Sequence, residues 1–282
     1  KAGDFTLLKK HMVDDRETFY GKLFHNREII CMYLYEYVGA DSDIVFQESE
    51  IDSVKWMELD TLLTLVKDNM IDHCIVYEDL FEVKEEIDKR LRLRKQLSFI
   101  LEADKEKRIM RQTYKTDMIK ENDAEHAWHL ALMVMLLSEH SNRPIDPFKT
   151  MCMVLIHDII EIDAGDTYAY DDKALESQRE REEKAADRIF SMLPVDQGTK
   201  LRALWEEFEA YESAEACFAH TMDNLQPTIL NNATDGISWV EHGVTIDKPM
   251  RRQARTKDGS ERLWQVVNRI LRTHVLKGHI KE

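Results

Sequence analysis

The sequence predicts an α+β protein, in which a small mixed α/β part at the N-terminal end is followed by an all-α helical bundle. Strands are indicated by "MYLYEYV" and "SVKW", two β-branched or aromatic stretches in the region of Met32–Lys55 that the polar "GADSD" separates. Helices are indicated by Tyr77–Gln112, which has no Gly or Pro and repeats apolar residues three and four positions apart. With 282 residues, 43% of them hydrophobic, the chain can form one large or two ordinary domains.

The expected elements follow in order along the chain. "ELDTLLTLVKDN" predicts an amphipathic helix, because its apolar residues fall on one face. The stretch from Tyr77 predicts one or two helices with the domain boundary inside them. Helical patterns then cover 123–141, 147–162, 173–192, 198–230 and 260–276, and "ATDGISWVEHGVTIDKPMRRQARTKDG" is expected to be a long loop. We therefore divide the chain into residues 1–76, a helical linker over 77–93 and a bundle over 94–282.

Charge and composition exclude several kinds of partner. The net charge is −15, which opposes binding to long nucleic acid because such binding rests on basic side chains that displace counterions. A small phosphorylated ligand is compatible with this charge, since a metal and one or two arginines can invert the field inside a pocket. The longest apolar run, Leu130–Leu137, is too short for a bilayer, so we expect no membrane partner and a cytoplasmic protein. The four cysteines lie far apart and indicate neither a zinc knuckle nor a disulfide framework.

Four side chains of the expected bundle form a candidate site for a divalent metal. In chain order they are His126, His157, Asp158 and Asp223. Imidazole nitrogen and carboxylate oxygen suit a first-row metal ion, and three helices can each bring a piece of the site to one point in a bundle core. The alternative for each histidine is a buried side chain with a structural hydrogen bond. Glu125, three residues after Asn122, is instead expected to close a capping box at the helix start.

This order of residues resembles the HD-domain superfamily of metal-dependent phosphohydrolases. More narrowly, "ENDAEHAWHLALM", "LIHDIIEIDAGDTYAYDD" and "MDNLQPTILN" look like the bacterial 5'-deoxynucleotidase branch and its related HD-domain-containing proteins. The likeness runs from about Arg94 to about Leu276. It implies that the four side chains bind one divalent ion, which could be Mn, Co, Zn, Fe or Mg.

The resemblance also implies roles for three further residues. Glu161 matches an acidic residue that positions or activates the attacking water, and its spacing from His157 lets it reach the same face. Asp166 matches an acidic residue that would serve the leaving group. Arg111 matches an arginine that contacts the substrate phosphate, which suits its planar fork; the alternative is a surface arginine on a charged helix.

The implied activity is hydrolysis of nucleoside 5'-monophosphates, in particular deoxy forms, to nucleoside and phosphate. Related HD enzymes suggest a homodimer.

Two other branches of the HD superfamily match less well. The di-iron oxygenases need extra histidines before the last Asp, where only His220 occurs, and the ppGpp hydrolases carry paired acids where this chain has Glu161-Ile162.

Residues 1–75 resemble the later half of a Nudix hydrolase, through a strand, an acidic stretch and the pattern E-x-x-x-V-x-W-x-x-L. The metal-binding Nudix box is not found in them. We therefore expect a longer natural Nudix–HD protein, for which a bifunctional pyrophosphohydrolase and phosphatase is an alternative activity. Otherwise the first part would be a docking or dimerisation module. A non-catalytic metal- or nucleotide-binding regulator is the alternative from a different class.

Overall fold

The computed structural model describes residues 5–47, 49–73, 75–165 and 178–282, and the chain divides into two compact units, Lys1–Leu91 and Arg92–Glu282. Helix α2 (Tyr77–Ala103) contains the point of division, so its first part belongs to one unit and its second part to the other. None of the helices in the described ranges has the length and apolar character that crossing a membrane requires.

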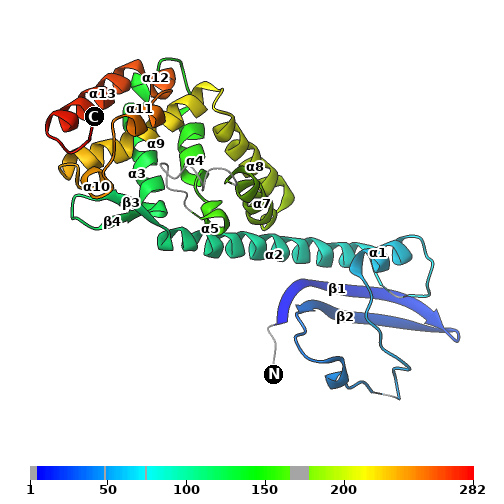
Figure 1. The fold of residues 1–282 in the computed structure, drawn as a ribbon. Coiled ribbons are helices and arrows are strands. Elements are labelled where there is room, and N and C mark those ends of the chain that lie inside the picture. The colour runs from blue at the N-terminus through cyan, green and yellow to red at the C-terminus, as the bar shows by residue number, and fades with distance from the viewer. Residues whose placement is uncertain (1–4, 48, 74, 166–177) are drawn as a thin grey trace. The chain divides into compact units, whose positions relative to one another are not determined.

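The N-terminal unit is built on one long antiparallel hairpin (Figure 1). Its strands are β1 (Phe5–Phe19) and β2 (Lys22–Tyr35). Tyr20 and Gly21 form the two-residue turn with φ of 49° and 76°. Positive φ at both positions is what a tight hairpin turn needs to match the right-handed twist of its strands.

The structure confirms the first predicted helix and corrects the predicted strands. Helix α1 (Leu59–Lys67) buries Leu63 and Val66, as its apolar spacing predicts. The strand predicted at "SVKW" is wrong, because residues 53–56 lie in no strand, and only the first four residues of "MYLYEYV" belong to β2. Most residues of β2 are exposed, so this strand lacks the alternation of apolar and polar residues by which a half-buried strand is predicted.

Helices make up most of the C-terminal unit. They are α3 (Asp123–Leu137), α4 (Pro147–Ile156), α5 (Glu161–Ala164), α7 (Gln178–Ser191), α8 (Val195–Ala210), α9 (Ala214–Ala233), α10 (Ile237–Glu241), α11 (Asp247–Arg252), α12 (Thr256–Gly259) and α13 (Glu261–Leu276). Short 3-10 helices cover Asp104–Arg108 and Ser138–His140. The unit is therefore the helical bundle that the sequence predicts.

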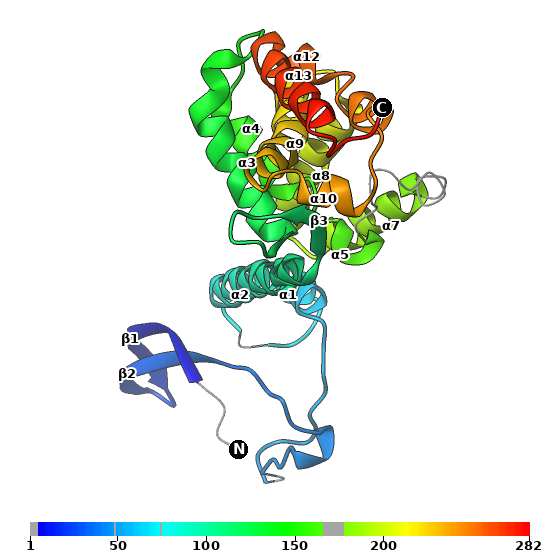
Figure 2. The same ribbon diagram turned by 60° about the vertical axis from the view of Figure 1, so that its left-hand side comes forward.

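Helix α9 forms the centre of this bundle (Figure 2). It contacts α3, α4, α8, α12 and α13. The main core around it includes Leu130, Met153, Phe218 and Met222, none of which is exposed. A second core, around Ile189 and Trp205, joins α7 and α8 to α5. The site described below lies where α3 and α4 meet α9.

One part of the bundle is not helical, so the all-α prediction is wrong in this detail. β3 (Met110–Tyr114) and β4 (Lys120–Asn122) form a short antiparallel pair. The helical pattern that was expected to continue to Gln112 ends as α-helix at Ala103. Strands of five residues or fewer contain too little pattern to stand out beside a long charged helix.

Several predicted helix bounds also change. The helix predicted over 198–230 divides at Tyr211, which has the left-handed φ of 55°, and Ser213 then caps α9 by accepting a hydrogen bond from the Ala216 amide. The helix predicted over 147–162 ends at Ile156, and turns cover 157–160 before α5. Of the helix predicted over 173–192, residues 173–177 lie outside the described residues, and α7 covers most of the remainder. The expected long loop contains α10, α11 and α12.

Candidate metal centre

The first histidine of the centre is positioned by the start of α3. The Asn122 side chain accepts a hydrogen bond from the Glu125 amide at 2.9 Å, and the Glu125 carboxylate accepts one from the Asn122 amide at 3.1 Å. This is the capping box predicted from the sequence. It fixes the first turn of α3, and His126 follows immediately with no exposed surface.

His157 and Asp158 lie in the turn that follows α4, not within a regular helix. The Nδ1 atom of His157 lies 2.9 Å from the Val154 carbonyl oxygen, which can only accept, so Nδ1 carries the proton and donates. Its Nε2 atom is buried and makes no hydrogen bond of regular geometry among the described residues, although the Asp158 carboxylate lies 3.1 Å away. A buried nitrogen without a hydrogen bond is a position that a cation can fill.

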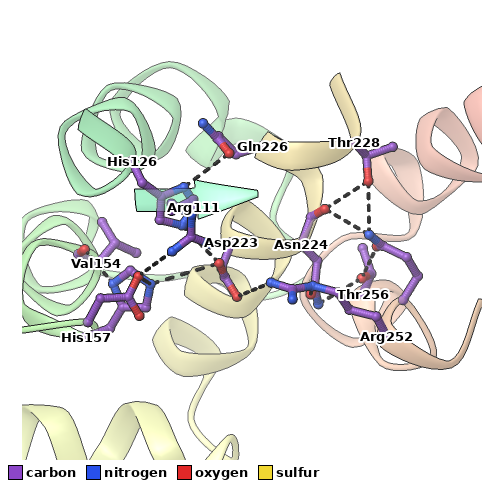
Figure 3. A network of polar contacts seen from close by, with 12 residues as sticks. Arg111, His126, Val154, His157, Asp223, Asn224, Gln226, Thr228, Arg252 and Thr256 are labelled. Atoms are coloured by element: carbon purple, nitrogen blue, oxygen red, sulfur yellow. Dashed lines mark hydrogen bonds and ion pairs between the residues drawn. The ribbon is translucent and has the colours of Figure 1, made fainter. Parts of the chain in front are cut away.

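Asp223 on α9 completes a compact group of donors with the two histidines (Figure 3). Its Oδ1 lies 3.0 Å from His126 Nε2 and 3.9 Å from His157 Nε2. One ligand atom from each of the three residues lies within 4.8 Å of the others, and no other such group occurs among the described residues. Two imidazoles and a carboxylate, all of low exposure, fit a first-row divalent ion.

Asp158 lies beside this group and joins it to Arg111. One of its oxygens, Oδ2, is 3.1 Å from His157 Nε2 and 2.9 Å from Arg111 Nη1. The structure therefore brings three of the four predicted ligands into one group, with the fourth in contact with His157.

Arg111 lies on β3 and not on the surface of a charged helix. Its side chain is 13% exposed, and Nη1 also lies 3.2 Å from Asp123. Burial opposes its charge, but the carboxylates of Asp158, Asp223 and Asp123 outweigh burial and raise the pKa of Arg111. The arginine stays charged and neutralises part of a cluster of acids.

Charge pairing sets the protonation of the donors. Burial acts to lower the pKa of His157, but the Asp158 carboxylate outweighs it and raises the pKa to about 9. Burial acts to raise the pKa of Asp158, yet His157 and Arg111 hold it below its usual value. Burial likewise opposes ionisation of Asp223, and Arg252 and His126 hold its pKa well below the ordinary range. Both carboxylates are ionised at neutral pH, and a cation that binds His157 must replace a proton there.

Of the two remaining predicted residues, Glu161 is among the described residues and Asp166 is not. Glu161 is half-buried at the start of α5, and its amide donates to the Asp158 carbonyl at 2.8 Å. Its charge also acts to raise the pKa of Arg111. Asp166 lies outside the described residues.

Several residues at the centre were not predicted from the sequence. Gln226 accepts a hydrogen bond from His126 Nδ1 at 3.1 Å and donates to Glu121 at 2.5 Å. Glu106 is buried nearby, and burial, together with the charges of Asp158 and Asp123, raises its pKa to about 7. Helical spacing could have indicated Gln226, which lies three residues after Asp223 on α9, but not Glu106, which comes from a separate 3-10 helix.

His220, the one histidine between the HD pair and Asp223, takes no part in the cluster. Its ring is stacked between Phe208 and Tyr211, with ring centroids 3.8 and 3.9 Å away, and Nε2 donates to the Phe208 carbonyl oxygen. Burial lowers its pKa to about 4, so it is neutral at neutral pH. Its environment is that of a structural histidine.

The fold and the site together define a helical bundle with a buried cluster of histidine and aspartate that can bind a metal. Residues 103–264, more than half of the chain, match the family described as HD domain. The chain therefore belongs to the HD domain family, and its resemblance to HD-domain proteins is confirmed over these residues.

The chain is also similar to individual proteins, among them two curated nucleotidases and one protein of known structure. The 5'-deoxynucleotidases HDDC2 of Homo sapiens and Bos taurus are each 30% identical to the chain, over 132 and 133 residues, or 46% of this chain. The chain spans about 63% of the length of these relatives. A crystal structure of a predicted metal-dependent phosphohydrolase from Magnetospirillum magnetotacticum MS-1 is 44% identical with a TM-score of 0.65, covering 68% of this chain and 96% of that one.

Proposed function

We propose that the protein is a metal-dependent phosphomonoesterase that hydrolyses nucleoside 5'-monophosphates, in particular deoxy forms, to nucleoside and phosphate. The observation that carries this proposal is the buried group of His126, His157 and Asp223, with Asp158 and Arg111 in contact beside it. Support comes from family membership and from the names of the relatives, 5'-deoxynucleotidase and metal-dependent phosphohydrolase.

One divalent ion, of Mn, Co, Zn, Fe or Mg, would be held by His126, His157, Asp158 and Asp223. Bound there, it would supply the Lewis acidity that activates water and polarises a phosphoryl oxygen. Both histidines would bind as neutral rings through Nε2, because their Nδ1 atoms are engaged with Gln226 and Val154.

The protein's own groups would carry the proton transfers and hold the phosphate. Glu161 would accept a proton from the attacking water as the new oxygen–phosphorus bond forms. Arg111 would help to neutralise the charge that develops on the phosphoryl oxygens. The bond from phosphorus to the 5' oxygen of the sugar breaks, and that oxygen takes up a proton. Asp166 is proposed as its source, on the family resemblance alone.

An assay of the purified protein tests this proposal. We expect release of inorganic phosphate from at least one of dAMP, dGMP, dTMP and AMP when manganese or cobalt is present, and none after the metal is chelated. No phosphate release with any of these metals would contradict the proposal. Consumption of a nucleoside diphosphate derivative to two phosphorylated products would favour the bifunctional alternative, and ligand binding without consumption would favour a regulator.

For the N-terminal unit, we propose a Nudix-like module without the metal-binding box. The pattern from Glu50 to Leu59 supports this proposal. A homodimer is proposed from the same family resemblance as the activity, and light scattering of the purified protein tests it.

A further inference from the structure

Arg252, in the segment expected to be a loop, extends to the candidate metal centre (Figure 3). It is the last residue of α11, and its Nη2 lies 3.4 Å from Asp223 Oδ2. Its Nε donates to the Asn224 side chain at 3.2 Å. The guanidinium group therefore lies against the outer oxygen of a proposed metal ligand, whose other oxygen faces His126.

Arg252 is held there by a buried polar network. The neighbouring Gln253 donates to the Asn224 carbonyl at 2.8 Å and to Thr228 Oγ1 at 3.1 Å. Thr256 in turn donates to Gln253 at 2.7 Å. These contacts join the segment of α11 and α12 to α9 and hold the backbone next to Arg252.

The packing of α12 supports the same conclusion. A Cβ atom at Gly259 would lie 2.3 Å from the Cys217 carbonyl oxygen on α9, so only glycine allows this approach. Thr221 also donates to the Thr256 carbonyl at 3.0 Å. A rigidly held arginine loses less conformational entropy on binding a ligand than one on a mobile loop.

The two arginines of the centre differ in how fully neighbouring acids neutralise them. Arg111 lies within 3.2 Å of both Asp123 and Asp158 and is 13% exposed. Arg252 is 27% exposed, and its one carboxylate contact among the described residues is the longer one, to Asp223. A guanidinium group has five N–H donors, and this contact and the one to Asn224 use two of its three nitrogens. Arg252 is therefore the more exposed of the two arginines and the one less neutralised by carboxylates.

We infer that Arg252 binds the phosphate group of the substrate on the Asp223 side of the centre. A phosphate dianion among several carboxylates needs a cation that is not already neutralised, and a guanidinium group pairs with phosphate in a bidentate manner. Arg111 is instead held by Asp158 and Asp123. This inference rests on the proposed function, which supplies the phosphate monoester.

The experiment compares wild-type protein with Arg252→Gln, Arg252→Lys and the matched control Arg251→Gln. Arg251 is the exposed neighbour on α11. With manganese-loaded protein, calorimetry gives the affinity for inorganic phosphate, steady-state assays give KM for dAMP and inhibition by deoxyadenosine, and elemental analysis gives the metal content.

We expect Arg252→Gln to weaken phosphate binding and raise KM by about 10- to 100-fold, the effect of losing hydrogen bonds from a charged group. Metal content and inhibition by deoxyadenosine should stay unchanged, because neither involves the phosphate. Arg252→Lys should retain part of the affinity, and Arg251→Gln all of it.

Two results would overturn the inference. One is unchanged phosphate affinity in both Arg252 variants. The other is loss of metal from Arg252→Gln with normal phosphate affinity once metal is saturating, because Arg252 would then only position Asp223. If wild-type protein binds phosphate through Arg252 but hydrolyses no nucleotide, the proposed function fails, while Arg252 is still shown to bind phosphate. If it hydrolyses nucleotides with a KM that Arg252→Gln leaves unchanged, the inference alone fails.

Discussion

At the scale of single residues, the orientation of two imidazole rings decides what the centre can bind. Gln226 accepts from Nδ1 of His126, and the Val154 carbonyl accepts from Nδ1 of His157. Each ring therefore directs Nε2 towards Asp223. Such partners fix the tautomer of a metal-binding histidine and hold its ring in place. The amide and the carbonyl are as much a part of the proposed centre as the rings themselves.

Glu161 gives the residue-scale prediction. Glu161→Ala should keep the bound metal but reduce kcat at least about 100-fold, since a positioned general base contributes that much or more. Asp163→Asn is the matched control on the same helix, because Asp163 is exposed and pairs with Arg188. Steady-state assays and elemental analysis of both variants check the prediction. Full activity in Glu161→Ala would show that the proposed role is wrong.

At the scale of elements, the capping box of Asn122 and Glu125 stabilises the first turn of α3. His126, a proposed metal ligand, is the next residue of this helix. Asn122→Ala should lower the free energy of unfolding by about 1 kcal/mol, the usual effect of losing an N-cap side chain. Asn122→Ser, which keeps a capping oxygen, should be close to wild type. Chemical denaturation monitored by the helical signal compares them. Equal stability of Asn122→Ala and wild-type protein would contradict this account of the helix start.

The elements also show what a sequence can and cannot predict here. The capping box at Asn122 and the amphipathic helix α1 follow from local patterns and are confirmed. The break at Tyr211 is not marked by glycine or proline, so 198–230 looked continuous. Strand β2 is largely exposed and carries little alternation. Local patterns predict elements whose stability is local or whose face is buried.

The residues of the candidate site also include some that the sequence predicts and some that it does not. His126, His157, Asp158 and Asp223 were found because their order and flanking residues resemble a family, and the structure brings three of them into one group with Asp158 beside it. Gln226 and Arg252 could not be found in this way. Gln226 lies three residues after Asp223 on the same helix, but its contact with His126 depends on how α9 packs against α3, and the position of Arg252 depends on its contacts with α9.

At the scale of the whole molecule, the distribution of charge is the main constraint. The chain has a net charge of −15, and its candidate site gathers three of the carboxylates, at Asp123, Asp158 and Asp223. Buried carboxylates are costly unless cations compensate them. Arg111 and Arg252 supply two positive charges in the structure, and a divalent ion would supply two more. An acidic chain can in this way present a site for a small anion.

The measurement that tests the central claim most directly is the metal content of the purified full chain and of three variants. Wild-type protein dialysed against manganese should retain about one ion per chain, the number that a single cluster of donors can hold. His126→Ala and Asp223→Asn should retain almost none, because each loses one of the few donors at the centre. His220→Ala, which changes a histidine outside the cluster, should retain the wild-type amount. Wild-type metal content in both His126→Ala and Asp223→Asn would contradict the proposed metal centre.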